Sequence, residues 1–187
     1  MNLGGYILDV DWNAFVEVKG PKLYQYFASR FEHQTADDLV QEVLIRLVRK
    51  VQSGEFDPGK GNLMSFAYGI SSFVAREQFK RKSNTREILR LNAESPADTP
   101  EDRPRPDEIL QQSEQAFLLR KAISELPDIE QEIIMLVLDK DISLQEVAEI
   151  SDMPLNTVKS HIHRAKQRLR EKLLSKPQGT SKETDNE

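Results

Sequence analysis

Cysteine is absent from this chain of 187 residues, and so are long hydrophobic runs. Without cysteine the protein forms no disulfide and offers no thiolate ligand to a metal, which is compatible with a reducing cytoplasm. No apolar run approaches the roughly 20 residues that cross a bilayer as a helix. The first residues, MNLGGYILDVDW, have neither the basic leader nor the apolar core of a signal peptide. We therefore expect a soluble, cytoplasmic protein without membrane insertion.

A strong excess of one charge is absent too. The 26 basic and 31 acidic residues give a net charge of −5, which argues against a protein that coats nucleic acid through overall positive charge. By our count, residues 91–116 alone carry a net charge of −5. Any basic surface must therefore be local. With 38% apolar residues, the chain suits one or two small helical domains and not one large core.

Apolar residues in the first ninety positions recur at spacings of three or four, which predicts amphipathic helices. Asp11 is expected to cap a short helix that Gly20-Pro21 ends, and a second helix follows from Leu23 to about Glu32. No function other than core packing is expected from the aromatic residues of this second helix.

Two further helices are expected in the same half. Thr35-x-x-Asp38 has the pattern of a capping box, so we expect a helix over about 36–52. A loop with the composition Asp-Pro-Gly-Lys-Gly follows. Asn62 or Ser65 then starts a helix whose later part is rich in lysine and arginine.

Residues 92–113 have the composition of a linker. Prolines keep such a segment extended, and its acids make it anionic. These acids are Glu94, Asp98, Glu101, Asp102, Asp107 and Glu108. A flexible spacer between two domains is the simplest interpretation. A helical pattern resumes within Ile109–Leu126, and the tail, residues 175–187, has a disordered composition.

The stretch from Leu126 to Leu173 predicts three helices separated by two stops. The first runs from about Ile129 to Leu138, and Asp139-Lys140-Asp141 ends it. Ser143-x-x-Glu146 is a capping box that begins a short second helix, and Pro154 suits the first position of a longer third one. A short capped helix, a tight turn and a second helix describe a helix-turn-helix.

The third of these helices is strongly basic. From Thr157 to Lys172 it carries six lysines and arginines against one acid, Glu171. Cations attract phosphates, and short polar groups meet base edges in a major groove. A solvated charged helix is the alternative for a basic helix taken alone. The capped helix and tight turn before it favour DNA binding.

The segment SLQEVAEISDMPLNTVKSHIHRAKQRL resembles the C-terminal domain of bacterial sigma factors of the extracytoplasmic-function (ECF) group, in the sigma-70 family. In that family this helix-turn-helix reads the −35 promoter element. The resemblance implies −35 contacts by residues in the N-terminal half of the basic helix. These are Asn156, Thr157, Lys159, Ser160, His161, His163 and Arg164.

The resemblance extends to the first half of the chain. DDLVQEVLIRLVRKV is similar to the segment by which sigma factors bind the coiled coil of the polymerase β′ subunit. The contacts with core RNA polymerase that it implies fall on Asp38, Gln41, Glu42, Ile45 and Arg49. Taken without the resemblance, this acidic face is a solvated first turn that the helix dipole favours.

The stretch from FDPGKGNLMSFAYGI to VAREQFKRK is similar to the part of the family that opens and reads the −10 element. Aromatic rings beside cations are what unstacked bases need. The residues implied are Phe66, Ser72, Phe73, Arg76, Lys80, Arg81 and Lys82, although core packing explains Phe66 better. The family commonly has Ile-Ala-Arg-Asn where this chain has Ile70-Ser71-Ser72-Phe73, so the bases read here do not follow from the family.

We therefore expect an all-α protein of two small helical domains joined by a flexible, acidic, proline-containing linker. Residues 1–91 would bind core polymerase and the −10 element, and residues 114–174 the −35 element. The expected function is that of a sigma factor, with core RNA polymerase, promoter DNA and an anti-sigma factor as partners. The resemblance also implies that the linker follows a basic channel of the polymerase. No phosphate loop, catalytic set, metal site or cofactor site is recognisable, so no enzyme is expected.

Two alternatives stay open. TVKSH also occurs in helix-turn-helix output domains of response regulators, so a stand-alone regulator is one of them, although it has no need of the DDLVQE helix. The other is a sigma mimic that sequesters an anti-sigma factor, for which a degraded basic helix is expected, and this one is intact. The sequence names neither the promoter, nor the inducing signal, nor the anti-sigma factor.

Overall fold

The computed structural model of the protein describes residues 10–92 and 114–174. Over these two ranges the chain forms seven α-helices and no strand, which confirms the expected all-α class. None of the described helices is both long and apolar enough to span a bilayer. The acids of the predicted linker, the first residues of the Ile109–Leu126 pattern and the predicted disordered tail lie outside the described residues.

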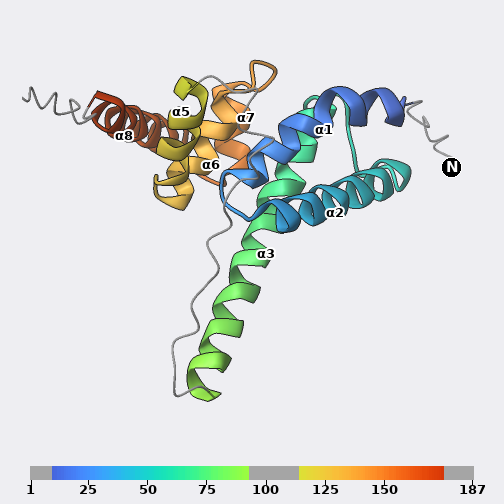
Figure 1. Cartoon of the computed structure of the whole chain (residues 1–187). Helices are drawn as coiled ribbons and strands as arrows, with labels where there is room; N and C mark the ends of the chain where they lie inside the picture. Colours follow the sequence, from blue (N-terminus) through green and yellow to red (C-terminus); the bar gives the residue numbers. More distant parts are fainter. Residues whose placement is uncertain (1–9, 93–113, 175–187) are drawn as a thin grey trace, which may run out of the picture.

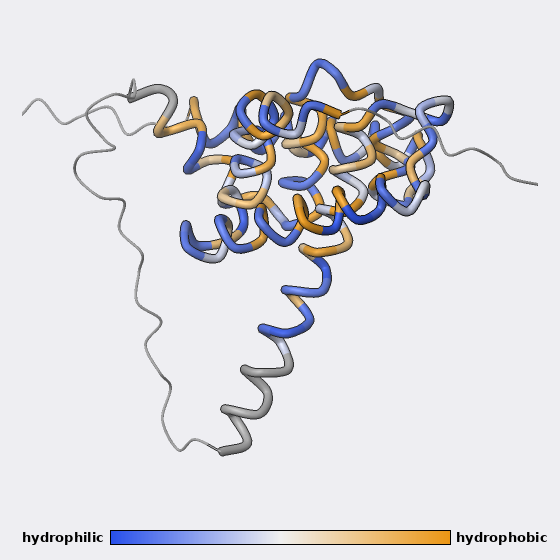
Figure 2. The backbone as a smooth tube through the Cα atoms, turned by 90° about the vertical axis from the view of Figure 1, so that its right-hand side faces the viewer, coloured by the Kyte–Doolittle hydropathy of each residue, from blue (hydrophilic) through white to orange (hydrophobic). Residues whose placement is uncertain are grey.

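Three helices form the first half, α1 (Trp12–Ala28), α2 (His33–Gln52) and α3 (Leu63–Asn92). α2 packs along α1 and α3, and Phe27, Val43 and Leu47 are fully buried between them. The second half of α3 projects beyond the other helices (Figure 1). Where its residues are described, this projecting part is mostly hydrophilic (Figure 2), as expected for a helix that faces water.

α1 is longer than the sequence predicts. Asp11 caps it as expected, since its Oδ1 accepts from the Ala14 N–H at 3.0 Å. The predicted stop at Gly20-Pro21 is wrong, because α1 continues through Pro21 to Ala28. An interior proline lacks one backbone N–H and is disfavoured in a helix. Pro21 is exposed, however, and Tyr26 and Phe27 beyond it are fully buried. Burial of this apolar face outweighs the missing hydrogen bond.

The capping box predicted at Thr35 is wrong as well. α2 begins about three residues earlier than expected, at His33, with Glu32 in the capping position and no side-chain hydrogen bond to the first turn. The earlier start extends the helix by backbone bonding, and the Ala36 N–H donates to the Glu32 carbonyl at 2.8 Å. For α3 the first of the two predicted starts is confirmed, because Asn62 Oδ1 accepts from the Ser65 N–H at 2.9 Å.

Four helices form the second half, α5 (Glu114–Ser124), α6 (Asp128–Val137), α7 (Leu144–Ile150) and α8 (Leu155–Leu174). The capping box is confirmed: Ser143 Oγ accepts from the Glu146 N–H at 3.2 Å, and Glu146 Oε2 from the Ser143 N–H at 2.8 Å. The turn between α7 and α8 holds Asp152 at a φ of 54°, which short polar residues adopt more readily than most. Pro154 precedes α8 instead of being its first residue.

The two halves are in contact, which the sequence did not predict. α6 and α7 pack against α1 and α3 (Figure 1). One continuous apolar core includes Tyr26 and Met64 from the first half and Leu136 and Val147 from the second. The molecule is thus closed on itself, although a linker is predicted between its halves.

Candidate nucleic-acid interface

α8 carries the residues predicted for the −35 element on its outer side. On its inner side Val158, Ile162 and Ala165 are buried. α8 packs through this inner side against α5, α6 and α7. Of the residues predicted to contact the −35 element, Thr157 and His161 are half-buried. The others, Asn156, Lys159, Ser160, His163 and Arg164, are exposed. The helix therefore presents cations and short polar groups together on the side that faces away from its core.

Side-chain contacts order part of this surface. Arg164 Nη2 lies 3.1 Å from His161 Nδ1, and Ser160 Oγ donates to the Asn156 carbonyl at 2.9 Å. A guanidinium only donates, so the imidazole is the acceptor in this contact. Two of the predicted base-contacting residues are thus held together before any DNA arrives.

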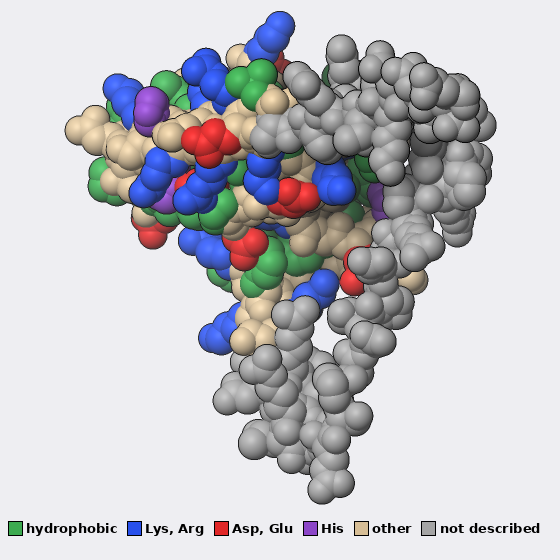
Figure 3. Space-filling view, turned by 60° about the vertical axis from the view of Figure 1, so that its left-hand side comes forward, with side chains coloured by type: hydrophobic (Ala, Val, Ile, Leu, Met, Phe, Trp, Pro, Cys, Tyr) green, Lys and Arg blue, Asp and Glu red, His purple; other side chains and the backbone are tan. Residues whose placement is uncertain are grey.

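A buried carboxylate lies beneath the same helix. Glu130 of α6 is only 3% exposed. Its Oε2 accepts from Arg168 Nη1 at 3.0 Å, and its Oε1 lies 3.9 Å from Arg164 Nε. On the face of the molecule shown in Figure 3, lysine and arginine side chains are likewise interleaved with acidic ones. Acidic side chains therefore pair with part of the basic surface, which is not a uniform positive patch.

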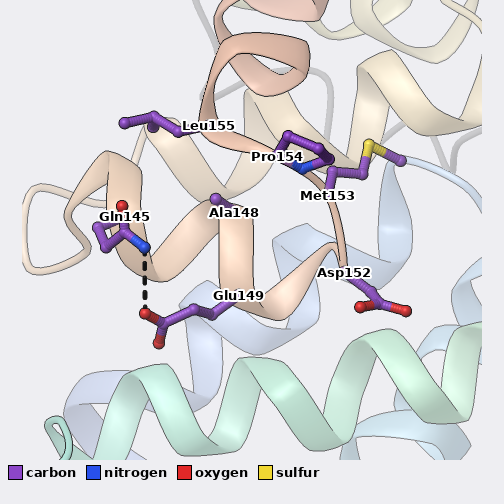
Figure 4. Close-up of a pocket in the computed structure, with 7 residues that line it drawn as sticks. All are labelled: Gln145, Ala148, Glu149, Asp152, Met153, Pro154 and Leu155. Carbon is purple, nitrogen blue, oxygen red and sulfur yellow. Dashed lines mark hydrogen bonds between the residues drawn. The ribbon is translucent and has the colours of Figure 1, made fainter.

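The turn between α7 and α8 carries a hollow of about 370 Å³ (Figure 4). Apolar side chains line part of it. Its polar lining includes Gln145, whose Nε2 donates to Glu149 Oε1 at 3.4 Å, and Asp152. Two carboxylates repel a phosphate, so this hollow does not belong to the nucleic-acid surface.

The cations predicted for the −10 element lie on the described part of α3. Arg76, Lys80 and Arg81 are exposed. Lys82 is half-buried, with its Nζ 5.5 Å from the centre of the Phe31 ring. The helix therefore offers positive charge along the segment that begins to project from the body of the protein (Figure 1).

The other predicted −10 residues differ in exposure. Phe73 is 52% exposed, and the Arg46 guanidinium lies 5.6 Å from its ring centre, so an aromatic face and a cation are presented together. Phe66 is half-buried against Phe56, with 5.3 Å between ring centres, which agrees with core packing. Ser72 is 1% exposed, and its side chain is covered in this conformation.

The residues predicted to bind core polymerase share the outer side of α2. Asp38, Gln41, Ile45 and Arg49 are exposed, and Ile45 exposes 52% of its surface. Glu42 is half-buried and pairs with Arg46 at 2.7 Å. Arg46 in turn pairs with Glu77 of α3 at 2.9 Å, which ties α2 to α3 behind this face.

Polar groups that sequence reasoning missed line the contact between the halves, which we call the interdomain interface. Hydrogen bonds and ion pairs cross this interface with the donor in the first half and the acceptor in the second. The donors are Lys19, Lys22, Tyr26, Arg30, Asn62, Ser65 and Tyr68, and the acceptors are Glu132, Asp139, Asp141 and Glu146. The two surfaces are therefore complementary in charge and in hydrogen bonding.

Asp139 occupies a central place in this interface, with a side chain that is 2% exposed. Its Oδ1 accepts from Lys22 Nζ at 2.7 Å, and its Oδ2 from the Tyr68 hydroxyl at 3.2 Å. Burial raises the pKa of the Tyr68 phenol well above its usual range, so it stays a donor at any ordinary pH. The residue that ends α6 thus also joins the two halves.

A second buried group surrounds Glu132. Its Oε1 accepts from the Tyr26 hydroxyl at 2.9 Å, and its Oε2 lies 3.6 Å from Arg30 Nη1. The Arg30 guanidinium also lies 4.2 Å from the centre of the Tyr26 ring. Arg30 has a side chain 2% exposed, yet its Nε and Nη2 have no hydrogen-bond partner among the described residues. Pairing of this buried cation is incomplete, which is unfavourable.

The charges at the edge of the interface stabilise one another. The hydrogen bond to Asp139 raises the pKa of Lys22. Hydrogen bonds from Lys19 and Lys22 lower the pKa of Asp141. Burial acts to raise the pKa of Glu146, but hydrogen bonds from two serines outweigh it, and the net shift is downward. At neutral pH the contact therefore joins charged lysines to charged carboxylates.

A cavity of about 590 Å³ lies beside the interdomain interface. Its lining comes from α2, the loop before α3, α3 itself and α7, and includes Phe56, Phe66 and Phe73. Because both halves contribute to it, this cavity belongs to the closed arrangement.

Two family models match the chain. Sigma-70 region 2 matches residues 16–85, and Sigma-70, region 4 matches residues 116–169. The first range contains every residue predicted for core polymerase and the −10 element. The second contains those predicted for the −35 element.

The chain is also similar to named sigma factors. The ECF RNA polymerase sigma factor EcfG of Rhodopseudomonas palustris is 31% identical over 134 residues, which cover 72% of this chain and 68% of that protein. The ECF RNA polymerase sigma factor SigE of Mycolicibacterium smegmatis is 27% identical over 164 residues, 87% of this chain. This alignment spans 61% of SigE, less than two thirds of its length.

The fold is similar to that of a solved sigma factor. The structure of RpoE in complex with the anti-sigma factor NepR from Bartonella quintana aligns with a TM-score of 0.65 at 23% identity. The alignment covers 89% of this chain and 99% of that one. The likeness therefore includes the helices of both halves.

Proposed function

The chain belongs to the ECF group of sigma-70 family RNA polymerase sigma factors, and from this membership we propose that it binds core RNA polymerase and directs it to a set of promoters. The observation that carries the proposal is the exposure of two unlike surfaces, one on α2 and one on α8, in the two family regions. A protein that only bound DNA would have no use for the α2 face.

The α2 face is the proposed contact with core polymerase. Exposed Ile45 between Gln41 and Arg49 gives an apolar centre with a polar rim, a composition common in protein interfaces. Asp38 and Glu42 add negative charge at the start of the face. Its partner is the coiled coil of the β′ subunit.

The two DNA contacts fall on α3 and α8. On α3, Phe73 offers a stacking surface, and the cations from Arg76 onward attract the strand at the −10 element. On α8, Lys159 and Arg164 contact phosphates or guanine, while Asn156 and Ser160 meet base edges of the −35 element. These assignments rest on exposure and side-chain chemistry.

The closed arrangement is the resting form of the free protein. The interdomain interface holds the −10 and −35 surfaces at one fixed separation, and they bind one promoter together only after the halves part. Core polymerase contacts each half at a different place, and its differential affinity for the open form supplies the free energy of opening. The linker keeps the released halves at a high effective concentration.

An anti-sigma factor is the second protein partner in this proposal. The similar sigma factor RpoE was solved in complex with the anti-sigma factor NepR. An anti-sigma factor that binds the closed form of this chain would keep it from polymerase. The protein itself acts by binding, in the cytoplasm, without an enzymatic reaction or a cofactor of its own.

Run-off transcription with core polymerase and genomic promoter fragments tests the function. Discrete transcripts are expected only when the protein and the core enzyme are both present. Asp38→Lys is expected to reduce binding to core polymerase without loss of helicity, and Asp37→Lys, an equal charge change at the next exposed residue of α2, serves as the matched control.

Two results would count against the proposal. Unchanged binding of core polymerase by a folded Asp38→Lys variant would show that the α2 face is the wrong contact. If the free protein already bound promoter duplex as tightly as the holoenzyme does, a stand-alone regulator would describe the chain better.

A further inference from the structure

Glu130 forms ion pairs with two arginines of α8, the helix that is proposed to read the −35 element. It lies on α6, is 3% exposed, and accepts from Arg168 Nη1 at 3.0 Å. Its second oxygen lies 3.9 Å from Arg164 Nε. A carboxylate is costly to bury unless it is paired, and both of these partners come from α8. The contact therefore couples the core of the second half to its outer surface.

Arg164 extends this connection outward. Its Nη2 lies 3.1 Å from His161 Nδ1, so Glu130, Arg164 and His161 form a line from the buried side of α8 to the exposed side. A free arginine samples many rotamers and loses that freedom when it binds. A guanidinium that is held in place beforehand loses less, which favours a ligand of matching geometry.

Glu130 favours specific contacts through Arg164, but it lowers the affinity of α8 for DNA in general. Its negative charge lowers the positive potential of α8 and so weakens the attraction to phosphates of any sequence. An acid beneath a DNA-binding helix thus opposes non-specific binding while it fixes the geometry of specific contacts. Both effects raise the ratio of specific to non-specific binding.

We propose that Glu130 is a positioning residue for −35 recognition. By holding Arg164 and Arg168 it increases discrimination between the correct upstream element and other DNA, and it lowers affinity for DNA in general. This inference rests on the proposed function, because it requires α8 to read DNA within the holoenzyme.

The test uses holoenzyme assembled from core polymerase and the full chain, with a promoter library randomised at the upstream element. Glu130→Gln keeps the shape and one acceptor but removes the charge. It is expected to fold, because the side chains of Arg164 and Arg168 are 53% and 45% exposed and stay hydrated. Base preference at the upstream positions should fall roughly three- to tenfold, less than the loss of a whole base contact. Binding to non-promoter DNA should rise.

Glu125→Gln is the matched control. Glu125 Oε2 accepts from Lys172 Nζ at 2.5 Å. Lys172 is also on α8 but lies C-terminal to the predicted −35 residues. This variant changes the net charge equally, so it should raise non-specific binding but leave base preference unchanged. In an Arg164→Ala background, Glu130→Gln should cause little further loss of preference, because Glu130 acts through that arginine.

Three outcomes would overturn the proposal. Unchanged base preference in Glu130→Gln, with or without a lower melting temperature, would leave Glu130 a purely structural role. An equal loss in Glu125→Gln would assign the effect to net charge alone. A full further loss in the Arg164→Ala background would show that Glu130 does not act through Arg164. If wild-type holoenzyme shows no preference at the upstream positions at all, the proposed role of α8 fails, and the inference falls with it.

Discussion

The interdomain interface and the packing of α7 on α8 differ in what they bury. The buried side chains of α7 and α8 themselves are apolar, among them Val147, Val158 and Ile162, although Ser151 in the turn between them is buried too. The interdomain interface also has apolar residues, but Asp139 and Glu132 are buried in it beside them. The packing of α7 on α8 resembles the interior of a domain, whereas the interdomain interface resembles two protein surfaces in contact.

This difference bears on how permanent each contact is. Apolar burial stabilises roughly in proportion to area. A buried ion pair offsets its desolvation only when the pairing is complete, and removal of one partner is strongly destabilising. Pairing of Arg30 with Glu132 is incomplete, because two of the arginine nitrogens lack a hydrogen-bond partner among the described residues. We infer that α7 and α8 stay together whereas the two halves open and close.

The largest expected effect comes from the apolar packing. Ile162→Ala leaves a cavity beneath α8 and should lower the free energy of unfolding of the second half by about 2–5 kcal/mol. Chemical denaturation followed by circular dichroism measures this. Lys166→Ala, at an exposed position of the same helix, should change it by less than about 0.5 kcal/mol. Equal effects of the two variants would contradict the assignment of Ile162 to the core.

A smaller effect is expected at the interdomain interface. Asp139→Ala leaves the Tyr68 hydroxyl without its acceptor, which should disfavour closure by about 1–3 kcal/mol. Lys22 is partly exposed and regains water, so the cost is below that of a fully buried charge. Fluorescence energy transfer between labels at Gln52 and Gln167, both exposed, follows opening, and the absence of native cysteine makes specific labelling simple.

Energy transfer combined with circular dichroism distinguishes opening from unfolding. In Asp139→Ala the distance between the labels should increase while helicity stays unchanged. An apolar set, Lys22→Met, Tyr68→Phe and Asp139→Leu, should close better than Asp139→Ala alone, because it leaves neither a charge nor a buried hydroxyl without a partner. Loss of helicity in Asp139→Ala would show that the interface is part of one indivisible core.

Acid should open the interface before it unfolds the helices. The pKa values of Asp141 and Glu146 are lowered in the closed form. Their contribution to closure is therefore fully present above the ordinary carboxylate pKa and is lost as pH falls through the lowered values. The closed fraction should be constant from about pH 7 to pH 5 and fall below about pH 4. In Asp141→Asn this fall should be shallower, and an identical pH profile would contradict the proposed linkage.

The smallest effect is expected at the exposed edge. Lys19 pairs with Asp141 at 2.6 Å, with 25% and 50% of the side chains exposed. Exposed ion pairs contribute little and are screened by salt. Lys19→Ala should therefore reduce closure slightly at low salt and not at all at about 1 M, where the Debye length is about 3 Å. A large effect that persists at high salt would place Lys19 among the central contacts.

Local signals explain which helices the sequence predicts well. The capping box at Ser143 involves residues only three positions apart, and it is confirmed. At Pro21 the local stop signal is overridden by tertiary packing, whereas at Thr35 backbone hydrogen bonding starts the helix before the predicted cap. The helix continues through Pro21 because the residues beyond it are needed in the core.

The candidate site divides in the same way. Exposure of Lys159, Arg164 and the α2 face follows from helical periodicity. The roles of Glu130 and Asp139 do not, because their partners are 38 and 117 residues away in sequence. Glu130 and Glu132 also flank a buried glutamine in α6, so three successive polar residues are buried. Periodicity does not predict such a helix, which is covered on several sides.

The one-directional hydrogen bonding of the interdomain interface has an evolutionary consequence. Since the donors lie in the first half and the acceptors in the second, a change to the buried set in one half weakens closure unless the other half changes with it. Positions 22 and 139, 26 and 132, and 65 and 146 should therefore covary among relatives that close in this way. A chimera that joins the first half of this chain to the second half of a relative should close only where that relative supplies acceptors at the matching positions.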